Sequence, residues 1–301
     1  MQWLSLLTDV EREAFIAEFI MLATDPDFIT SHPAIVHKDL NGTNTFTAQA
    51  DADDVETEAT MAAITETGTY ASTDYTFSRE DWSCGLRYLQ MEAGTEMATA
   101  SGDRLAPARV ALGYIKSYAH TLTGLIATAA STFSAQYKDA SAAALTGEDL
   151  FDAIHAFETA AGRKAGLCVL HPTAVRDLRK DTLFTQASNA VVFGPELEAL
   201  KSISGGTFVA RLANGVDIYQ SAQVPVVSSK RAGAIWARGG IGTCSRTPAI
   251  QEPGAQQVLG MLRFTQKASD VGPSGYMRGE TYMGAGVAFD ELGGLFFTHS
   301  Y

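Results

Sequence analysis

The chain has 301 residues, 46% of them hydrophobic and 19% charged, so it can bury a large core in one domain or two. Its net charge of −12 disfavours direct binding to nucleic-acid phosphates, which depends on lysine and arginine. No apolar run approaches the ~18 residues that span a bilayer, and the N-terminal residues lack a signal-peptide pattern. We expect a protein that is made in the cytoplasm and does not enter a membrane.

Cysteine use points away from disulfide and zinc chemistry. The three cysteines, Cys84, Cys168 and Cys244, are far apart, and none belongs to a CxxC pair. A disulfide framework or a structural zinc site needs more cysteines or closer spacing. We therefore expect neither.

The N-terminal residues are predicted to form one short helix. Thr8 to Glu11 has the form of a capping box, and near-helical apolar spacing continues until Asp25 and Pro26. Proline ends the pattern because it cannot continue a helix without losing a backbone donor.

A long polar segment follows, and strand propensity brackets it at Thr45–Ala48, Tyr75–Phe77 and Cys84–Glu92. A segment with so few apolar residues buries little by itself. It is predicted to be a long hairpin that projects from the body and is covered by a partner chain. Its acidic group lacks the glycine and spacing of an EF-hand loop, so we interpret this group as solvated or partner-facing: Asp51, Asp53, Asp54, Glu56 and Glu58.

The clearest periodic signal predicts a long helix. Apolar residues recur every three or four positions from Leu105 to Phe133, with Pro107 in the first turn. The helix is predicted to run on through Tyr137, as a rod of about 45–50 Å. Such a stripe usually packs against the protein's own core, and a coiled-coil partner surface is the alternative.

The rest of the chain mixes helices and strands. Thr146 begins a helix that is predicted to stop at Gly162, and the apolar strand Leu167–Leu170 follows. A helix over Glu196–Ile203 precedes several short strands broken by glycine. This order predicts an α+β protein without internal repeats.

His171 is the strongest candidate for catalysis, because it ends a buried strand just before a helix. A hydrolase or transferase would pair it with Cys168 or Asp177. However, a single CxxH pair supplies two of the four ligands of structural zinc, and strand residues three apart face opposite sides. The six histidines are scattered, and the nucleotide-binding and hydrolase motifs are missing from the sequence. A structural function is therefore favoured, with no cofactor, no metal and no catalytic residue.

The order of the elements resembles the major capsid proteins of tailed bacteriophages, those with the Hong Kong ninety-seven phage fold. An N-terminal arm, an extended hairpin and a long spine helix come first. The strand and helix of "CVLHPTAVRDLRK" follow, then "NGVDIYQSAQVPVV" and the glycine-broken strand "AGAIWARGGIG". The closing segment "FTQKASDVGPSGYMRGETYMGAGVAF" suits the family's peripheral domain.

The resemblance implies four parts. Residues 1–42 would form the arm, 43–92 the extended loop, 93–165 with 247–301 the peripheral domain built on the spine helix, and 166–246 the axial domain. Heterologous contacts that close would build rings of identical subunits.

The function implied by the resemblance is structural. Pentamers and hexamers of the chain would assemble into the icosahedral shell of a virion, enclosing double-stranded DNA without sequence-specific contacts. No charged helical segment precedes the arm, so we expect a separate scaffold protein, with a portal and decoration proteins as further partners. The expected inter-subunit contacts are Asp53, Asp54, Glu56, Glu58, Tyr70, Arg176, Arg179, Lys180, Lys230, Arg231 and Arg278. An encapsulin-type nanocompartment around a cargo enzyme is the alternative.

Overall fold

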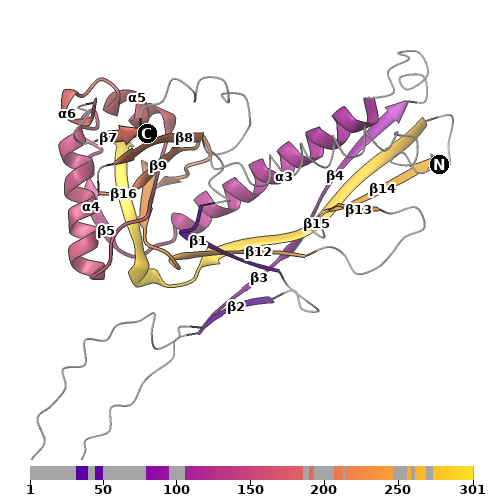
Figure 1. Ribbon diagram of the computed structural model, residues 1–301, viewed down its shortest axis with the longest axis horizontal. Helices are drawn as coiled ribbons and strands as arrows, with labels where there is room; N and C mark the ends of the chain where they lie inside the picture. Colours follow the sequence, from indigo (N-terminus) through magenta and orange to yellow (C-terminus); the bar gives the residue numbers. More distant parts are fainter. Residues whose placement is uncertain are drawn as a thin grey trace, which may run out of the picture.

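A computed structural model describes residues 32–39, 45–49, 79–94, 106–185, 190–192, 207–212, 214–246, 256–258, 262–268 and 274–300. The predicted helices at residues 8–25 and 196–203 lie outside these ranges, as does the strand predicted at 75–77. The described elements form an elongated molecule with a compact block at one end (Figure 1).

The compact block is built on an eight-stranded sheet with the order β5-β16-β11-β6-β9-β8-β7, in which β10 also pairs with β11. The strands are β5 (Gln136–Asp139), β6 (Leu167–Leu170), β7 (Ala190–Val192), β8 (Thr207–Leu212), β9 (Asp217–Gln220), β10 (Val226–Val227), β11 (Lys230–Trp236) and β16 (Gly293–Ser300). The pairs β6–β9 and β5–β16 are parallel, while β11 is antiparallel to both β6 and β16.

Helices cover both faces of this sheet. On one face, α4 (Gly147–Ala161), α5 (Pro172–Leu178) and α6 (Thr182–Thr185) pack on Cys168 and Leu170 of β6. On the other, the C-terminal half of α3 (Ala106–Ala130) packs on Leu167 and Val169. Alternate strand residues point to opposite faces, so a strand covered on both sides has apolar residues at every position. This accounts for the unbroken apolar run of β6.

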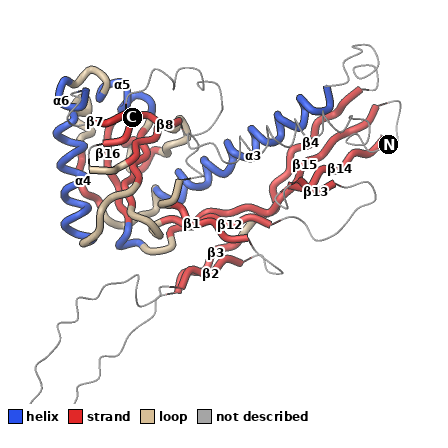
Figure 2. Tube along the Cα trace, in the orientation of Figure 1, coloured by secondary structure: helices blue, strands red, loops and turns tan. Residues whose placement is uncertain are grey.

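The long part of the molecule is a six-stranded sheet. Its strands are β1 (Ile35–Asp39), β4 (Gly85–Gly94), β12 (Ile241–Arg246), β13 (Gln256–Val258), β14 (Leu262–Ala268) and β15 (Ser274–Val287). The central strand β15 pairs along one edge with β4 and along the other with β14 and β12, and β1 pairs in parallel with β12. Figure 2 shows α3 running along this sheet toward the compact block.

A separate two-stranded ribbon, β2 (Thr45–Gln49) and β3 (Arg79–Ser83), leaves the body on the far side of β12 (Figure 1). The predicted strands at Thr45–Ala48 and Cys84–Glu92 are confirmed as β2 and β4. Their pairing differs from the hairpin expected, because β2 pairs with β3, whereas β4 is hydrogen-bonded to β15 in the body.

The long helix is confirmed, but its predicted end is wrong. α3 ends at Ala130, where the hydroxyls of Ser131 and Thr132 donate to carbonyls three residues back and so compete with helix hydrogen bonds. Its 25 residues span ~38 Å. Tyr137 instead belongs to β5, where tertiary pairing with β16 overrides the apolar periodicity.

The next two helices begin close to their predicted positions. α4 has Thr146 as its N-cap, and Gly162 ends it in the left-handed conformation, with φ of 64°. α5 begins at Pro172, directly after His171, which is its N-cap. Pro is suited to this first position because the N–H it lacks has no partner within the helix.

The expectation that the cysteines form no disulfide is wrong for one pair. Cys84 and Cys244 are bonded, with their Cα atoms 6.6 Å apart, and Cys168 remains a buried thiol. The pairing of β12 and β4 with β15 brings together residues that are 160 positions apart. Cysteine count and spacing contain no information on such a contact.

Candidate assembly surfaces

Three of the predicted contact residues form an exposed group at the C-terminal end of α5, named here the α5 basic cluster: Arg176, Arg179 and Lys180. Among the residues that the structure describes, only Arg176 of this cluster has a close carboxylate, with Nη2 3.3 Å from Oδ1 of Asp177. Asp177 is buried and also accepts a hydrogen bond of 2.9 Å from Nε2 of His299. The cluster thus presents positive charge to solvent, which can attract an acidic partner.

Lys230 and Arg231 lie at the start of β11 and are engaged within the subunit. Lys230 forms an ion pair with Asp139 and stands over the ring of Phe297, 5.7 Å from its centroid. Hydrogen bonds from Lys230 and then Ser141 lower the pKa of Asp139 to about 2. Because Asp139 already neutralises its charge, Lys230 attracts an acidic group of a neighbour less strongly than an unpaired lysine would.

Arg231 and Arg278 also have partners in the subunit. Nη1 of Arg231 donates to the carbonyl of Val224 at 3.1 Å. Nε of Arg278 lies 3.2 Å from Oε2 of Glu280, whose side chain is only 6% exposed. A buried carboxylate is costly without a cation, so Arg278 stabilises β15.

The remaining predicted contacts lie outside the described residues: Asp53, Asp54, Glu56, Glu58 and Tyr70. Their role as inter-subunit contacts stays a prediction.

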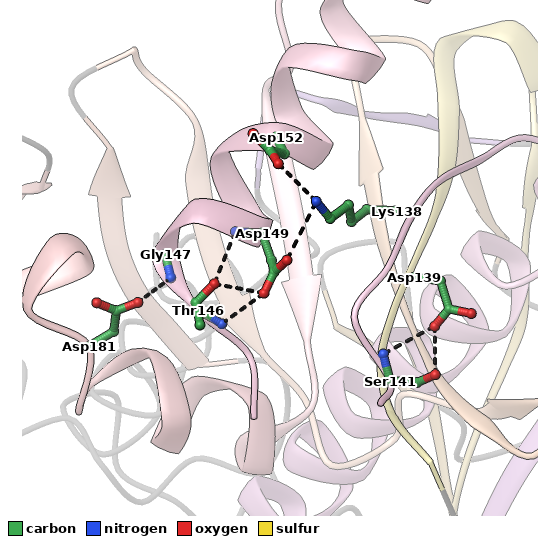
Figure 3. Close-up of polar contacts among 8 residues, drawn as sticks. All are labelled: Lys138, Asp139, Ser141, Thr146, Gly147, Asp149, Asp152 and Asp181. Carbon is green, nitrogen blue, oxygen red and sulfur yellow. Dashed lines mark hydrogen bonds and ion pairs between the residues drawn. The ribbon is translucent and has the colours of Figure 1, made fainter. Parts of the chain in front are cut away.

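A polar network holds the first turn of α4 in place within the compact block (Figure 3). The hydroxyl of Thr146 accepts from the backbone of Asp149, whose carboxylate accepts from the backbone of Thr146. Lys138 of β5 reaches across to Asp152 at 2.8 Å and Asp149 at 3.5 Å, and the backbone N–H of Gly147 donates to Asp181. Negative groups at a helix N-terminus are favourable, so these contacts stabilise the first turn of α4.

The geometry around His171 does not support the hypothesis of a hydrolase or transferase that uses this residue. Nδ1 of His171 accepts from the backbone of Thr173 at 3.3 Å and lies 2.8 Å from its hydroxyl. Burial, followed by the charges of Arg231 and His299, lowers the pKa of His171.

The two candidate partners of His171 are occupied elsewhere. Cys168 is fully buried, and burial raises the pKa of its thiol. Burial favours protonation of Asp177, but hydrogen bonds from His299 and Arg176 outweigh this and hold its pKa below the ordinary value. Asp177 is thus bound to these two residues, and His171 is the N-cap of α5.

Sequence reasoning missed a buried group centred on Asp217 of β9, which is 4% exposed. Nε and Nη2 of Arg211 contact its two oxygens at 2.6 and 2.7 Å, and Nε2 of His32 lies 2.9 Å from Oδ2. Burial would raise the pKa of Asp217, but the bonds from Arg211 and His32 hold it below the ordinary value. The group fastens the segment before β1 to the compact block.

Two exposed apolar side chains on β4 were also missed. Leu86 is 49% exposed and Tyr88 is 70% exposed. They are two residues apart, so they face the same side of the strand. Among the described strands, β4 pairs only with β15, which leaves its outer edge open. Neighbouring exposed apolar groups on an open strand edge are typical of surfaces that pair with another chain.

Within the described ranges, no group of three His, Cys, Asp or Glu side chains gathers as a metal site would require. None of the described helices is long and apolar enough to cross a membrane.

Comparison by sequence identifies no relative, since neither a family model nor a curated protein matches the chain. Solved structures do match. The capsid of a native GTA particle superposes with a TM-score of 0.60 at 14% identity, over 89% of each chain. The capsid of Cyanophage P-SCSP1u superposes with a TM-score of 0.55 at 14% identity, over 91% of this chain and 89% of that chain.

The SrpI encapsulin of Synechococcus elongatus also matches, with a TM-score of 0.54 at 11% identity, over 88% of this chain and 85% of that chain. At such identities the likeness establishes the fold. The chain has the Hong Kong ninety-seven phage fold of shell-forming proteins, as the order of its elements predicted.

Proposed function

We propose that the chain is a major capsid protein, which assembles through pentamers and hexamers into the icosahedral shell of a tailed double-stranded DNA phage. The observation that carries this proposal is the match of the chain, along nine-tenths of its length, to the subunit of a capsid. The function is structural and non-catalytic, which agrees with the capping role of His171 and the burial of Cys168.

The shape of the subunit supports assembly. The ribbon of β2 and β3 projects from the body, and β4 presents Leu86 and Tyr88 to solvent. Leu86 and Tyr88 are exposed in the single subunit, whereas a neighbour in a shell would bury them. Burial of apolar surface contributes ~25 cal/mol per Å², repeated at every equivalent contact of a closed shell.

Inter-subunit contacts are proposed at two complementary kinds of surface. The α5 basic cluster is exposed, and α5 itself contains one acidic residue, Asp177, which is buried. The acidic residues between 51 and 58 supply the opposite charge from another subunit. Lys230, Arg231 and Arg278 are retained as secondary contacts, because each already has a partner in its own subunit.

The division into arm, extended loop, peripheral domain and axial domain is part of the proposal. The loop would leave the body at Ser83, where β3 ends, because β4 belongs to the six-stranded sheet. The expected partners are a scaffold protein, a portal and decoration proteins, with packaged DNA enclosed rather than bound by sequence. The finished protein would reside in the virion.

An encapsulin-type nanocompartment is the second candidate, favoured by the match to the SrpI encapsulin. The two candidates differ in contents. Expression of the full chain, alone and with the neighbouring genes of its source, followed by electron microscopy of the purified particles, tests for shells. Nuclease-protected DNA inside them supports the capsid, and a co-purifying cargo enzyme supports the encapsulin. A chain that stays monomeric at high concentration with those partners present contradicts both.

A further inference from the structure

The chain passes from the ribbon into the six-stranded sheet at a bonded cysteine. β3 ends at Ser83 and β4 begins at Gly85, so Cys84 is the single residue between them. Its partner Cys244 lies on β12. The bond therefore joins the base of the ribbon to a strand of the body that is reached only much later in the sequence.

The third strand at this junction leaves room for the bond. Gly284 of β15 lies opposite Cys244 in the register of the sheet. A Cβ atom at position 284 would stand 3.2 Å from Sγ of Cys244, 3.3 Å from Cα of Cys84 and 3.0 Å from the carbonyl oxygen of Ser83. A residue other than glycine would thus crowd both cysteines.

Apart from the bond, β3 packs against β15 of the body, but no strand pairing within the described residues joins the ribbon to the six-stranded sheet. β2 and β3 pair with each other, and the described strands include no third partner for them. Ser83 and Gly85 are exposed on either side of Cys84, whereas Cys84 is only 5% exposed and Cys244 is fully buried. Ser83 and Gly85 are paired in β3 and β4, whereas Cys84 between them belongs to neither strand, so the direction of the ribbon depends on the backbone at Cys84.

We propose that Cys84 and Cys244 form a redox-controlled lock on the direction of the ribbon. The proposal rests on the proposed shell function. The cytoplasm keeps thiols reduced, so subunits would enter assembly with both thiols free and the ribbon able to turn. The bond closes once the shell meets an oxidising medium, and it fixes the ribbon against the six-stranded sheet.

Closure proceeds by thiol–disulfide exchange with a small disulfide of the oxidised-glutathione class. The Cys84 thiolate attacks one sulfur of that disulfide, and the first thiolate leaves. The Cys244 thiolate then attacks the Cys84 sulfur, forms the internal bond and expels the second thiolate. Two protons leave the cysteines, and two electrons reduce the small disulfide to two thiols. Cys168 takes no part, because it is buried in the core between β6 and the helices.

Thiol counting tests the lock directly. Cells making the full chain are lysed in denaturant that contains excess iodoacetamide, and the number of alkylated cysteines is read by mass spectrometry. We expect three alkylated thiols in chains from the cytoplasm. In shells treated with oxidised glutathione and then labelled in denaturant we expect one, at Cys168. Three reactive thiols after oxidation, or one in the cytoplasmic chains, would overturn the proposal.

Hydrogen exchange tests what the bond does. Backbone amides of Arg79–Ser83 should exchange more slowly in oxidised shells than in reduced shells. This difference should vanish in Cys84→Ser and, should that variant fold poorly, in Cys244→Ala, while Cys168→Ala should retain it. Equal exchange rates in oxidised and reduced wild-type shells would show that the bond does not restrict motion of the ribbon. If the wild-type chain forms no shell, the shell function fails, and thiol counts on single subunits still report whether the bond opens and closes.

Discussion

Nε2 of His32 lies 2.9 Å from Oδ2 of Asp217, although the two residues are 185 positions apart. Nδ1 of the same ring accepts from the backbone N–H of Ala34 at 3.1 Å, which assigns the ring proton to Nε2. His32 is therefore a neutral donor to a carboxylate that Arg211 also binds at both oxygens. This contact fixes where the chain enters β1.

Replacement of Asp217 by Asn should destabilise the subunit by about 2 kcal/mol, because it weakens hydrogen bonds to a charged, buried acceptor. The folded-state pKa of Asp217 is below the unfolded value of 3.8, so its stabilisation is complete above that value and is lost as the pH falls through the folded pKa. Urea denaturation of unassembled subunits, from pH 7 down to acid, measures both effects.

Asp152→Asn is the matched control for Asp217→Asn. Asp152 also pairs with a cation, Lys138, but its side chain is 56% exposed, so water replaces the lost contact and a change below ~0.5 kcal/mol is expected. Equal losses in the two variants would argue against a special contribution from the buried group.

The cap at His171 should make stability depend on pH near neutrality. Its pKa in the folded chain is below the ordinary value of 6.5, so the unfolded chain binds more protons as the pH falls through this range, and the folded state loses stability. His171→Asn keeps a capping acceptor without a titrating ring. The variant should therefore lose less stability between pH 7 and pH 5 than the wild type.

The control for this measurement is His155→Gln, because His155 is exposed on α4. It should leave the pH dependence of the denaturation midpoint as it is in the wild type. An unchanged pH dependence in His171→Asn would refute the assignment of the effect to the helix cap.

Local features of the fold could be predicted from sequence, because they depend on neighbouring residues. Thr146 and Gly162 mark the two ends of α4, since a hydroxyl caps the first turn and glycine adopts the left-handed conformation after the last. The unbroken apolar run of β6 likewise indicates a strand that is covered on both faces.

Features that depend on distant pairing could not be predicted. Tyr137 continues the apolar spacing of α3, yet pairing with β16 makes it part of a strand. The bond of Cys84 to Cys244 and the contact of His32 with Asp217 join residues more than 150 positions apart. The ion pair of Lys230 with Asp139 could not be predicted for the same reason, because Asp139 lies on another strand.

Charge reversal in the α5 basic cluster should slow assembly without unfolding the subunit. Arg179→Glu with Lys180→Glu replaces two exposed cations, so the free energy of unfolding should change by less than ~0.5 kcal/mol. If acidic groups of a neighbour are attracted there, the assembly rate measured by light scattering should fall at least about tenfold in low salt. The difference should shrink at high salt, where charges are screened.

The double variant Lys164→Glu with Arg238→Glu controls for net charge. It makes the same change at exposed positions outside the cluster. Its assembly rate should stay near that of the wild type at each salt concentration. Equal slowing in both double variants would mean that net charge, and not the α5 basic cluster, sets the rate.

The exposed apolar residues of β4 should matter for assembly and little for folding. Leu86→Ser with Tyr88→Ser removes side chains that are 49% and 70% exposed in the single subunit, so the denaturation midpoint of the variant should move little. If a neighbour covers this edge, the variant loses ~1.5–3 kcal/mol of association free energy for each side chain that would be fully buried. This loss raises the critical concentration for shell formation at least about tenfold. Val226→Ser, on a residue 39% exposed on β10, serves as the control. If the β4 variant forms shells at the wild-type concentration, this edge is not an assembly surface.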